Sequence, residues 1–484
     1  MVIGGRPIGF MSKRFVGIDS AGKFDLSSYH PEIFENAASD SNRAFLNHFN
    51  VNVPKLFCSG VVSNPQLVNK EEKDKWIDKH KALFLKIGAG LGLSYDGSIT
   101  VTCNDNFSLK KLAGLDASRN IDSISVSSFN IWKDEIITFS KSTNFPQLKE
   151  LAFYSHGLDA KLVGILARSP NLKNLASLSF FGKFIGTEGV KAIAQSSYLE
   201  NLTELHLYDD RIEDEGAKAI AQSPFLQNLR SLSLTRCDIG DEGARAMIES
   251  RNLKNLISLN LNSNYISCKG VSFLANSPNL AQLEHLSMGD NHIGIGDEGA
   301  RALAKSVYIG NLTHLDLTRN GIGDEGVIAI VQSPQLKNLT YLDLCYNKIG
   351  DEGAATLAES PLLKYACSQE KSLSLRDNQI GDKGAKAIAQ SPYIAELESL
   401  CLNGNRIGDE GAIALANSPH LEFLSSLFLS QNQVGGEGIM TIIESPYLKN
   451  LKSLYIRGDN LSREEWELIR RCERFKKDFS ILTY

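Results

Sequence analysis

The sequence predicts an α/β solenoid, in which short parallel strands line the concave face and helices line the convex face. The pattern Leu-x-Leu, with Phe, Met or Ile in place of the second leucine in four copies, occurs twelve times, beginning at Leu151, and most copies are 27 residues apart. Each copy is followed by a turn signal and then by apolar residues at helical spacing. A fixed period of roughly 20 to 50 residues is typical of stacked strand and helix units, which bury a core only when neighbours are present.

The unit at residues 312–338 illustrates the expected strand and turn. Leu315 and Leu317 alternate with polar residues, as in a strand that is buried on one face. Asn320 follows at the bend, where a short amide can bond backbone groups that a turning chain leaves unpaired. Ile322 is then expected to point back into the core.

The same unit predicts a helix over residues 325–332, with an apolar stripe at i, i+3 and i+4. Gly323 would allow the chain to reverse, and Asp324 would be the helix N-cap. Pro334 ends the helix, because proline disfavours helical geometry in the residue before it. Each unit is therefore one strand, one turn and one helix.

The repeating motif LxxLxLxxNxIGDEGAxAIAxS resembles the leucine-rich repeat of the ribonuclease-inhibitor-like subfamily, over about 330 residues. The near-identical GDEGA spacers are also similar in style to effectors of intracellular bacteria of the Legionella type. The resemblance implies a leucine-rich-repeat horseshoe that binds proteins rather than an enzyme.

Departures from the motif are concentrated in the N-terminal half. The bend asparagine recurs seven times, as Asn264, Asn291, Asn320, Asn347, Asn378, Asn405 and Asn432. Earlier units carry His156, Lys183, Asp210 and Cys237 at that position. Two residues are inserted around Gly294 and four near residues 364–370, either as drift in an outer loop or as contact loops. The strand phase extends backward to residues 124–126 and 99–101.

The ends of the chain lack the repeat, so we expect three parts: residues 1–95, 96–461 and 462–484. Residues 70–86 predict an amphipathic helix, which would cap the N-terminal end of the solenoid. Residues 462–477, with Ser462 as N-cap, predict the closing helix. The glycine-rich residues 88–92 are interpreted as a turn, because a phosphate-binding loop would follow a strand and precede a helix.

Composition restricts the class of partner and the compartment. The net charge is −5, and there is no basic run, so a nucleic acid partner is not expected. There is no stretch of about 18 apolar residues and no signal-peptide core, so neither a membrane span nor a signal peptide is expected. The eight cysteines are scattered without a CxxC pair, which predicts free thiols in a reducing, cytoplasmic compartment.

No pattern typical of catalysis is present, so the chain is not expected to be an enzyme or to need a cofactor or metal. Asp-Glu pairs recur at the helix starts, where they are interpreted as caps rather than as acid–base or metal groups. The nine histidines form neither an HExxH motif nor a Cys/His metal spacing.

Two clusters on the concave face are candidate partner-binding sites. Tyr154, Phe181 and Tyr208 each follow a Leu-x-Leu pair on neighbouring strands and would form an aromatic column; the alternative is packing among themselves or against the N-terminal cap. The second cluster pairs like charges on neighbouring strands, which a partner or nearby arginines must balance. Its residues are Asp316, Arg319, Asp343, Tyr346 and Arg376.

The sequence therefore predicts a non-catalytic scaffold that binds a protein partner on its concave face. By resemblance, its setting would be a host cell, entered by a route without a signal peptide. One alternative is a ubiquitin-ligase adaptor, since residues 29–57 faintly resemble an F-box. Another is a regulator of a small GTPase, by analogy with the Ran GTPase activator, although that family carries an acidic tail and this chain ends in RFKKDFSILTY.

Overall fold

The computed structural model describes four short strands within residues 2–25, and residues 70–86, 89–93, 99–103, 109–127, 133–154, 157–182, 185–365, 371–456, 461–471 and 480–483. The chain divides into two compact units, Met1–Val68 and Asn69–Tyr484. In the first unit, β1 (Val2–Ile3) pairs antiparallel with β2 (Arg6–Pro7), and β3 (Gly17–Ile18) with β4 (Phe24–Asp25). The F-box-like segment, residues 29–57, lies outside the described residues.

The second unit is built on two sheets of 11 and 5 strands, β5–β15 and β16–β20. The first sheet comprises β5 (Ala89–Leu93), β6 (Ile99–Cys103), β7 (Ser123–Val126), β8 (Glu150–Phe153), β9 (Ser177–Phe181), β10 (Glu204–Tyr208), β11 (Ser231–Thr235), β12 (Ser258–Asn260), β13 (His285–Ser287), β14 (His314–Asp316) and β15 (Tyr341–Asp343). The second comprises β16 (Ser372–Ser374), β17 (Ser399–Cys401), β18 (Ser426–Phe428), β19 (Ser453–Ile456) and β20 (Ser480–Thr483).

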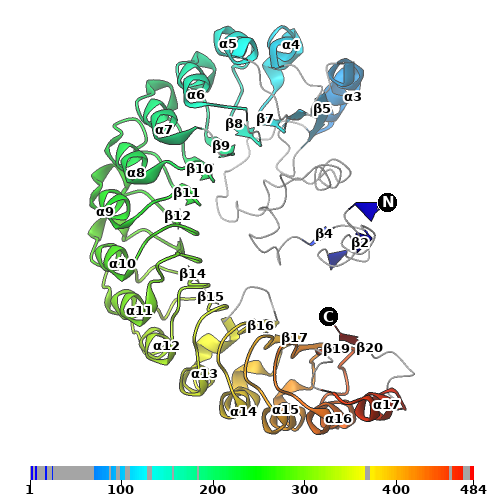
Figure 1. The fold of residues 1–484 in the computed structure, drawn as a ribbon. Helices are drawn as coiled ribbons and strands as arrows, with labels where there is room; N and C mark the ends of the chain where they lie inside the picture. The colour runs from blue at the N-terminus through cyan, green and yellow to red at the C-terminus, as the bar shows by residue number, and fades with distance from the viewer. Residues whose placement is uncertain are drawn as a thin grey trace. The chain divides into compact units, whose positions relative to one another are not determined.

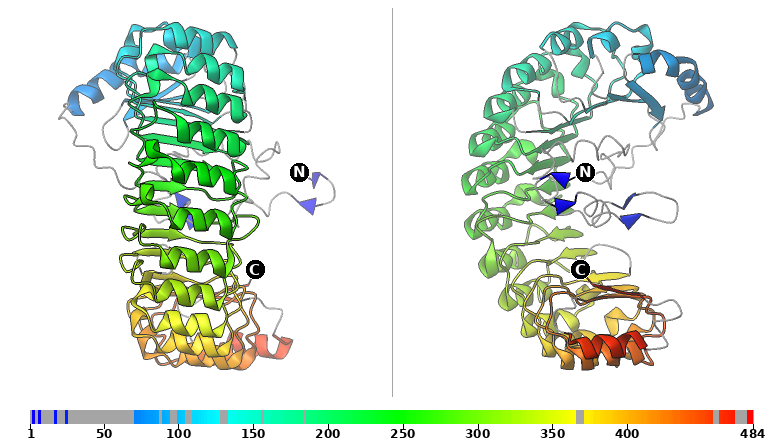
Figure 2. Two further views of the ribbon diagram at one scale, coloured as in Figure 1. Left: turned by 90° about the vertical axis from the view of Figure 1, so that its left-hand side faces the viewer. Right: turned by 45° about the vertical axis from the view of Figure 1, so that its right-hand side comes forward.

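Helices alternate with these strands along the chain. They are α3 (Lys70–Lys86), α4 (Leu109–Ala113), α5 (Lys133–Lys141), α6 (Ala160–Leu166), α7 (Gly186–Ala194), α8 (Glu213–Gln222), α9 (Asp241–Glu249), α10 (Cys268–Ala275), α11 (Gly296–Lys305), α12 (Asp324–Val331), α13 (Asp351–Ala358), α14 (Asp382–Gln390), α15 (Asp409–Ala416), α16 (Gly436–Glu444) and α17 (Arg463–Arg471). Within this unit the strands line the inner, concave side and the helices the outer side (Figures 1 and 2).

The predicted solenoid is confirmed. The twelve Leu-x-Leu pairs form β8–β19, and every strand pair from β6 to β15 and from β16 to β20 is parallel. The backward extension of the phase is confirmed by β6 and β7. The helices begin at, or one residue before, the aspartate of each Asp-Glu pair, as α12 does at Asp324. The sheet is divided between β15 and β16, near the predicted insertion, part of which (366–370) is not described.

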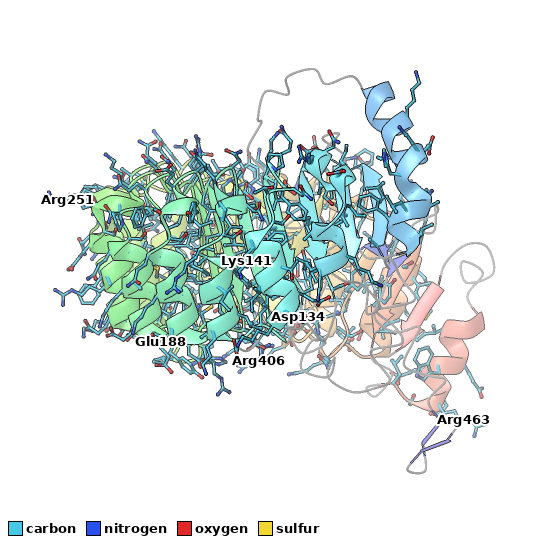
Figure 3. All side chains as sticks on the ribbon, turned by 90° about the horizontal axis from the view of Figure 1, so that it is seen from above. Asp134, Lys141, Glu188, Arg251, Arg406 and Arg463 are labelled. Atoms are coloured by element: carbon cyan, nitrogen blue, oxygen red, sulfur yellow. The ribbon has the colours of Figure 1, made fainter. Side chains whose placement is uncertain are left out.

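A single hydrophobic core runs through the second unit, from Phe84 in α3 to Ile469 in α17. Leu317 and Ile322 have no exposed surface, as the alternation of residues predicts. Charged side chains such as Asp134, Lys141 and Glu188 lie on the outer helices (Figure 3) and are exposed. Among the described helices, none has the length and apolar character needed to cross a bilayer.

The bend asparagines link consecutive repeats, as the sequence predicts for this residue type. Asn347 Oδ1 accepts from the backbone N–H of Asn320 and of Ile322 in the preceding repeat, each at 3.0 Å. Its Nδ2 donates to the carbonyl oxygens of Leu317 (3.0 Å) and Leu344 (3.1 Å). A buried amide thereby satisfies backbone groups on both sides of a repeat boundary. His156 and Lys183, at the same position in earlier units, lie outside the described residues.

The prediction that each aspartate caps its own helix is wrong. The N-cap of α12 is Gly323, and Asp324 is the first helical residue. Asp297 of the preceding repeat accepts instead, with Oδ1 2.7 Å from the N–H of Gly323 and 3.0 Å from that of Gly326. Asp324 in turn accepts from Gly350 at 2.6 Å. The caps therefore join neighbouring repeats.

This arrangement corrects the role assigned to the spacer glycines. Gly323 has a φ of −103°, a conformation open to any residue, so the reversal does not need glycine there. At Gly326, a Cβ would lie 2.6 Å from Asp297 Oδ1. Glycine is required because the carboxylate of the preceding repeat occupies that space. Positive φ values in this turn are adopted by Arg319 (52°) and Gly321 (72°) instead.

Residues 88–92 were expected to form a turn, and this prediction is wrong for residues 89–92. They lie in β5, which pairs antiparallel with β6 and closes the edge of the parallel sheet. Ala89 is buried and Gly90 faces Thr102 on β6, so the residues alternate between two faces. Pairing with β6 outweighed the local signal of the glycines. The predicted N-terminal helix is α3, which packs against β5.

The C-terminal end contains the expected helix and one further strand. Ser462 and Glu465 form a reciprocal cap at the start of α17: the N–H of Ser462 donates to Glu465 Oε2 at 2.7 Å, and Ser462 Oγ accepts from the N–H of Glu465 at 3.2 Å. The sequence did not predict β20, which pairs parallel to β19. The last part of the chain therefore adds a strand to the sheet.

Candidate functional site

Each repeat strand presents three outward positions on the concave face: the residues before, between and after the two leucines. On β10 these are Glu204, His206 and Tyr208, which alternate with the buried Leu205 and Leu207. The register is continuous from strand to strand, so equivalent positions form three columns across the sheet. Any ligand of this face must contact these columns.

The aromatic column forms as predicted. The rings of Tyr154 and Phe181 are stacked, with centroids 4.6 Å apart and an interplanar angle of 10°. The rings of Phe181 and Tyr208 follow at 6.2 Å and 34°. All three side chains are partly exposed. The alternative of mutual packing is thus also observed, and the packed rings form a pre-positioned apolar surface on β8–β10.

Asp316 and Asp343 lie directly opposite each other on β14 and β15, as predicted. Asp316 accepts from the N–H of Thr318 and from Asn262 Nδ2, each at 3.0 Å. Asp343 accepts from the N–H of Cys345 at 2.9 Å. Burial, and then the charge of Asp343, raise the pKa of Asp316 above its ordinary value. The two carboxylates are therefore fixed in position while they repel each other.

The two arginines of the second cluster form ion pairs with Asp290 and Asp377. Arg319 Nε is 3.7 Å from Asp290 Oδ1, and Arg376 Nε is 2.6 Å from Asp377 Oδ2. Both guanidinium groups also lie against the ring of Tyr346, at 4.9 and 5.3 Å from its centroid. Burial raises the pKa of Tyr346 well above its ordinary value. Part of this cluster is thus balanced internally.

Sequence reasoning missed a second stack beside the aspartates. His285 and His314 lie in register on β13 and β14, with ring centroids 4.2 Å apart, and Tyr341 on β15 follows at 5.5 Å. Burial lowers the pKa of both histidines, which favours their neutral form. The signal was available in the sequence, because these residues occupy the position before the first leucine in consecutive units.

The described side chains form neither a metal-binding cluster nor a disulfide. Within the described residues, no group of three or more His, Cys, Asp or Glu side chains is placed to hold a metal ion. Four of the eight cysteines have described side chains, and all four are free thiols: Cys237, Cys268, Cys345 and Cys401. Burial raises the pKa of the Cys401 thiol, which keeps it protonated.

Asp316→Asn should stabilise the protein at neutral pH by about 0.5 kcal/mol, because it removes one of two directly opposed like charges. An aspartate whose pKa is raised by folding contributes stability that is full at low pH and is lost as the pH rises through the raised pKa. The gain from Asn should therefore vanish in acid, where Asp316 is protonated anyway. Thermal melts of both proteins at neutral and acid pH test this, and a loss of stability at neutral pH would contradict it.

The fold and the outward columns define a class of protein: a repeat solenoid whose exposed sheet is a continuous binding surface. The family model described as Leucine Rich repeat matches residues 198–221, 225–247, 281–304, 311–331, 335–358, 371–389 and 397–416. These seven segments are leucine-rich repeats. No curated protein matches it in sequence.

Several solved structures are similar to this chain. An internalin (inlF) from Listeria monocytogenes is 19% identical, with a TM-score of 0.43, over 79% of this chain and 94% of that one. The Rad7 and Elc1 complex of yeast gives 18% identity and a TM-score of 0.44, over 86% and 94%. The TLR13–ssRNA13 complex gives 20% and 0.42, over 74% of this chain and 45% of that one.

Proposed function

We propose that this leucine-rich-repeat protein is a non-catalytic scaffold that binds a protein partner on the concave face of its solenoid, over the aromatic column of Tyr154, Phe181 and Tyr208. The observation that carries the proposal is the stack of three partly exposed rings on adjacent strands. Rings held by their neighbours lose little conformational freedom on binding, and a partner that covers them removes further apolar area from water.

The proposed setting is the cytoplasm of a host cell, with a bacterial effector acting on a host protein. The similarity of the GDEGA spacers to effectors of intracellular bacteria supports this setting. The free thiols of the four described cysteines agree with a reducing compartment. The net charge of −5 and the carboxylates of the concave face favour a protein partner over a nucleic acid.

Replacing Tyr154, Phe181 and Tyr208 together by alanine should weaken partner binding at least about 100-fold. The rings are already partly buried, so each should contribute about 1 kcal/mol of the roughly 2.7 kcal/mol that a 100-fold change requires. Affinity capture from host-cell lysate with mass spectrometry identifies the partner, and titration of the purified pair gives the change in affinity.

The matched control is the equivalent column in the C-terminal half, where Asn403→Ala with Ser430→Ala should change affinity little. Circular dichroism must show that the triple variant is folded. Normal binding by a folded triple variant would overturn the proposed location. The site would then be sought around Asp316, Asp343 and Arg376.

A further inference from the structure

Over strands β8–β15, the outward positions of the concave face carry more negative than positive charge. The outward positions of the eight strands β8–β15 contain four carboxylates and neither lysine nor arginine. The remaining outward residues are serine, threonine, asparagine, alanine, glycine, cysteine, histidine and the aromatic side chains. The first outward cation is Arg376, after β16. The four carboxylates are Glu150, Glu204, Asp316 and Asp343.

The carboxylates form two pairs. Between the pairs lie strands β11–β13, whose outward positions contain no carboxylate, lysine or arginine. Glu150 and Glu204 both lie opposite Ser177 on β9, in the row beside the short side chains Ala152 and Ser179. No large side chain on β8 or β9 therefore separates this acidic row from the aromatic column. Glu204 Oε2 is 3.7 Å from His206 Nε2 on the same strand.

The second pair is held by neutral donors. Asp316 is fixed by a backbone N–H and an asparagine side chain, and Asp343 by a backbone N–H. These three donors position the carboxylates and carry no positive charge themselves. Because Asp316 and Asp343 lie in register on adjacent strands, a cation that approaches from the concave side would reduce the repulsion between them.

We propose that the partner's docking surface is basic: it presents lysine or arginine side chains to Glu150 and Glu204 and to Asp316 and Asp343, with an apolar side chain on the aromatic column. This inference rests on the proposed function. Charge complementarity argues for this occupant, because the outward positions of β8–β15 carry four carboxylates and neither lysine nor arginine, while the nearby Arg319 lies 3.7 Å from Asp290. The aromatic column supplies the apolar contact that carboxylates alone lack.

The spacing of the pairs sets the size of the contact. From β8 to β15 there are seven strand intervals, or roughly 34 Å at about 4.8 Å each. An extended segment of about ten residues or a helix of about 22 residues covers that distance. One continuous segment of the partner can therefore contact both pairs of carboxylates and the aromatic column.

A library of random 15-residue peptides displayed on phage, selected on the full-length protein, tests the proposal. Peptides with two or more lysines or arginines and an aromatic or large apolar residue should be enriched. For a chosen synthetic peptide, Glu150→Gln with Glu204→Gln should weaken binding about 10-fold, and Asp316→Asn with Asp343→Asn by a similar factor. The affinity should also fall as the salt concentration rises.

The matched control is Glu359→Gln with Glu444→Gln, which removes the same charge from exposed positions on the helical side and should leave the affinity unchanged. Enrichment of acidic or uncharged peptides, or of none, would overturn the basic-partner inference. If such uncharged peptides still lose binding in the triple aromatic variant, the proposed site stands and only its charge preference fails.

Two further outcomes are distinguishable. Basic peptides that bind the folded triple aromatic variant as tightly as the wild type would overturn the aromatic location in the proposed function. A concentration-dependent dimer of the protein alone, seen by sedimentation and disrupted by the same variant, would identify a second copy as the occupant and overturn the assignment of a basic partner.

Discussion

Leu317→Asp should unfold the repeats around β14 and β15. Leu317 has no exposed surface and lies in the continuous core, and its N–H donates to Asp343 O on the next strand at 3.0 Å. The substitution removes an apolar side chain that contributes about 2–5 kcal/mol, and it also buries a carboxylate without a partner. The total cost should reach at least about 5 kcal/mol, enough to unfold a marginally stable array locally or completely.

Thermal and urea melts followed by circular dichroism measure this cost. Ser233→Asp is the control, because it places the same residue at an outward position on β11 and should cost less than about 1 kcal/mol. Equal losses in the two variants would show that the inward and outward positions have been exchanged.

Asn347→Ala should cost on the order of 4 kcal/mol although no core side chain is removed. The backbone N–H groups of Asn320 and Ile322 and the carbonyl of Leu317 would lose a buried partner. Each unsatisfied buried group costs about 1–3 kcal/mol, reduced where water can enter. Because these groups belong to the repeat that precedes Asn347, we expect the loss to loosen the boundary between the two repeats.

Hydrogen exchange resolves the effect by position: amide protection should fall first around residues 317–322 and 344–349. Lys348→Ala, at the exposed neighbouring position, is the control and should leave stability unchanged. A cost below about 1 kcal/mol for Asn347→Ala would contradict the structural role assigned to the bend asparagines.

The strands, the helices and the core positions could be predicted because each repeat carries its own periodicity, with a period of 2 in Leu315 and Leu317 and near 3.6 in α12. The aromatic column could be predicted for the same reason, since the outward position after each leucine pair is fixed once the register is known. Whether a partner occupies that column is a property of the partner and is not encoded in the periodicity.

The errors arose where contacts cross a repeat boundary. Asp324 has the local signature of an N-cap, but its acceptor oxygen is used by Gly350 in the next unit. Residues 89–92 have the local signature of a turn, but β6 pairs with them. The stack of His285 and His314 was missed because only two of the three outward columns had been considered.

An aspartate of one unit accepts a hydrogen bond from a glycine N–H of the next unit. This repeated contact affects how the array can change in length during evolution. From Asp214 onward, most units end in the same connector: a carboxylate on one side and a glycine N–H on the other, as between Asp382 and Gly408 or Asp409 and Gly435. When a gene duplication or deletion adds or removes one 27-residue block, the new junction contains the same connector. No new interface between units then has to be optimised. The join at α11 is an exception, since Cys268 stands where the aspartate would be. Interior units are thus interchangeable in their joins while their outward residues diverge, so the length of the binding face and its specificity can evolve separately.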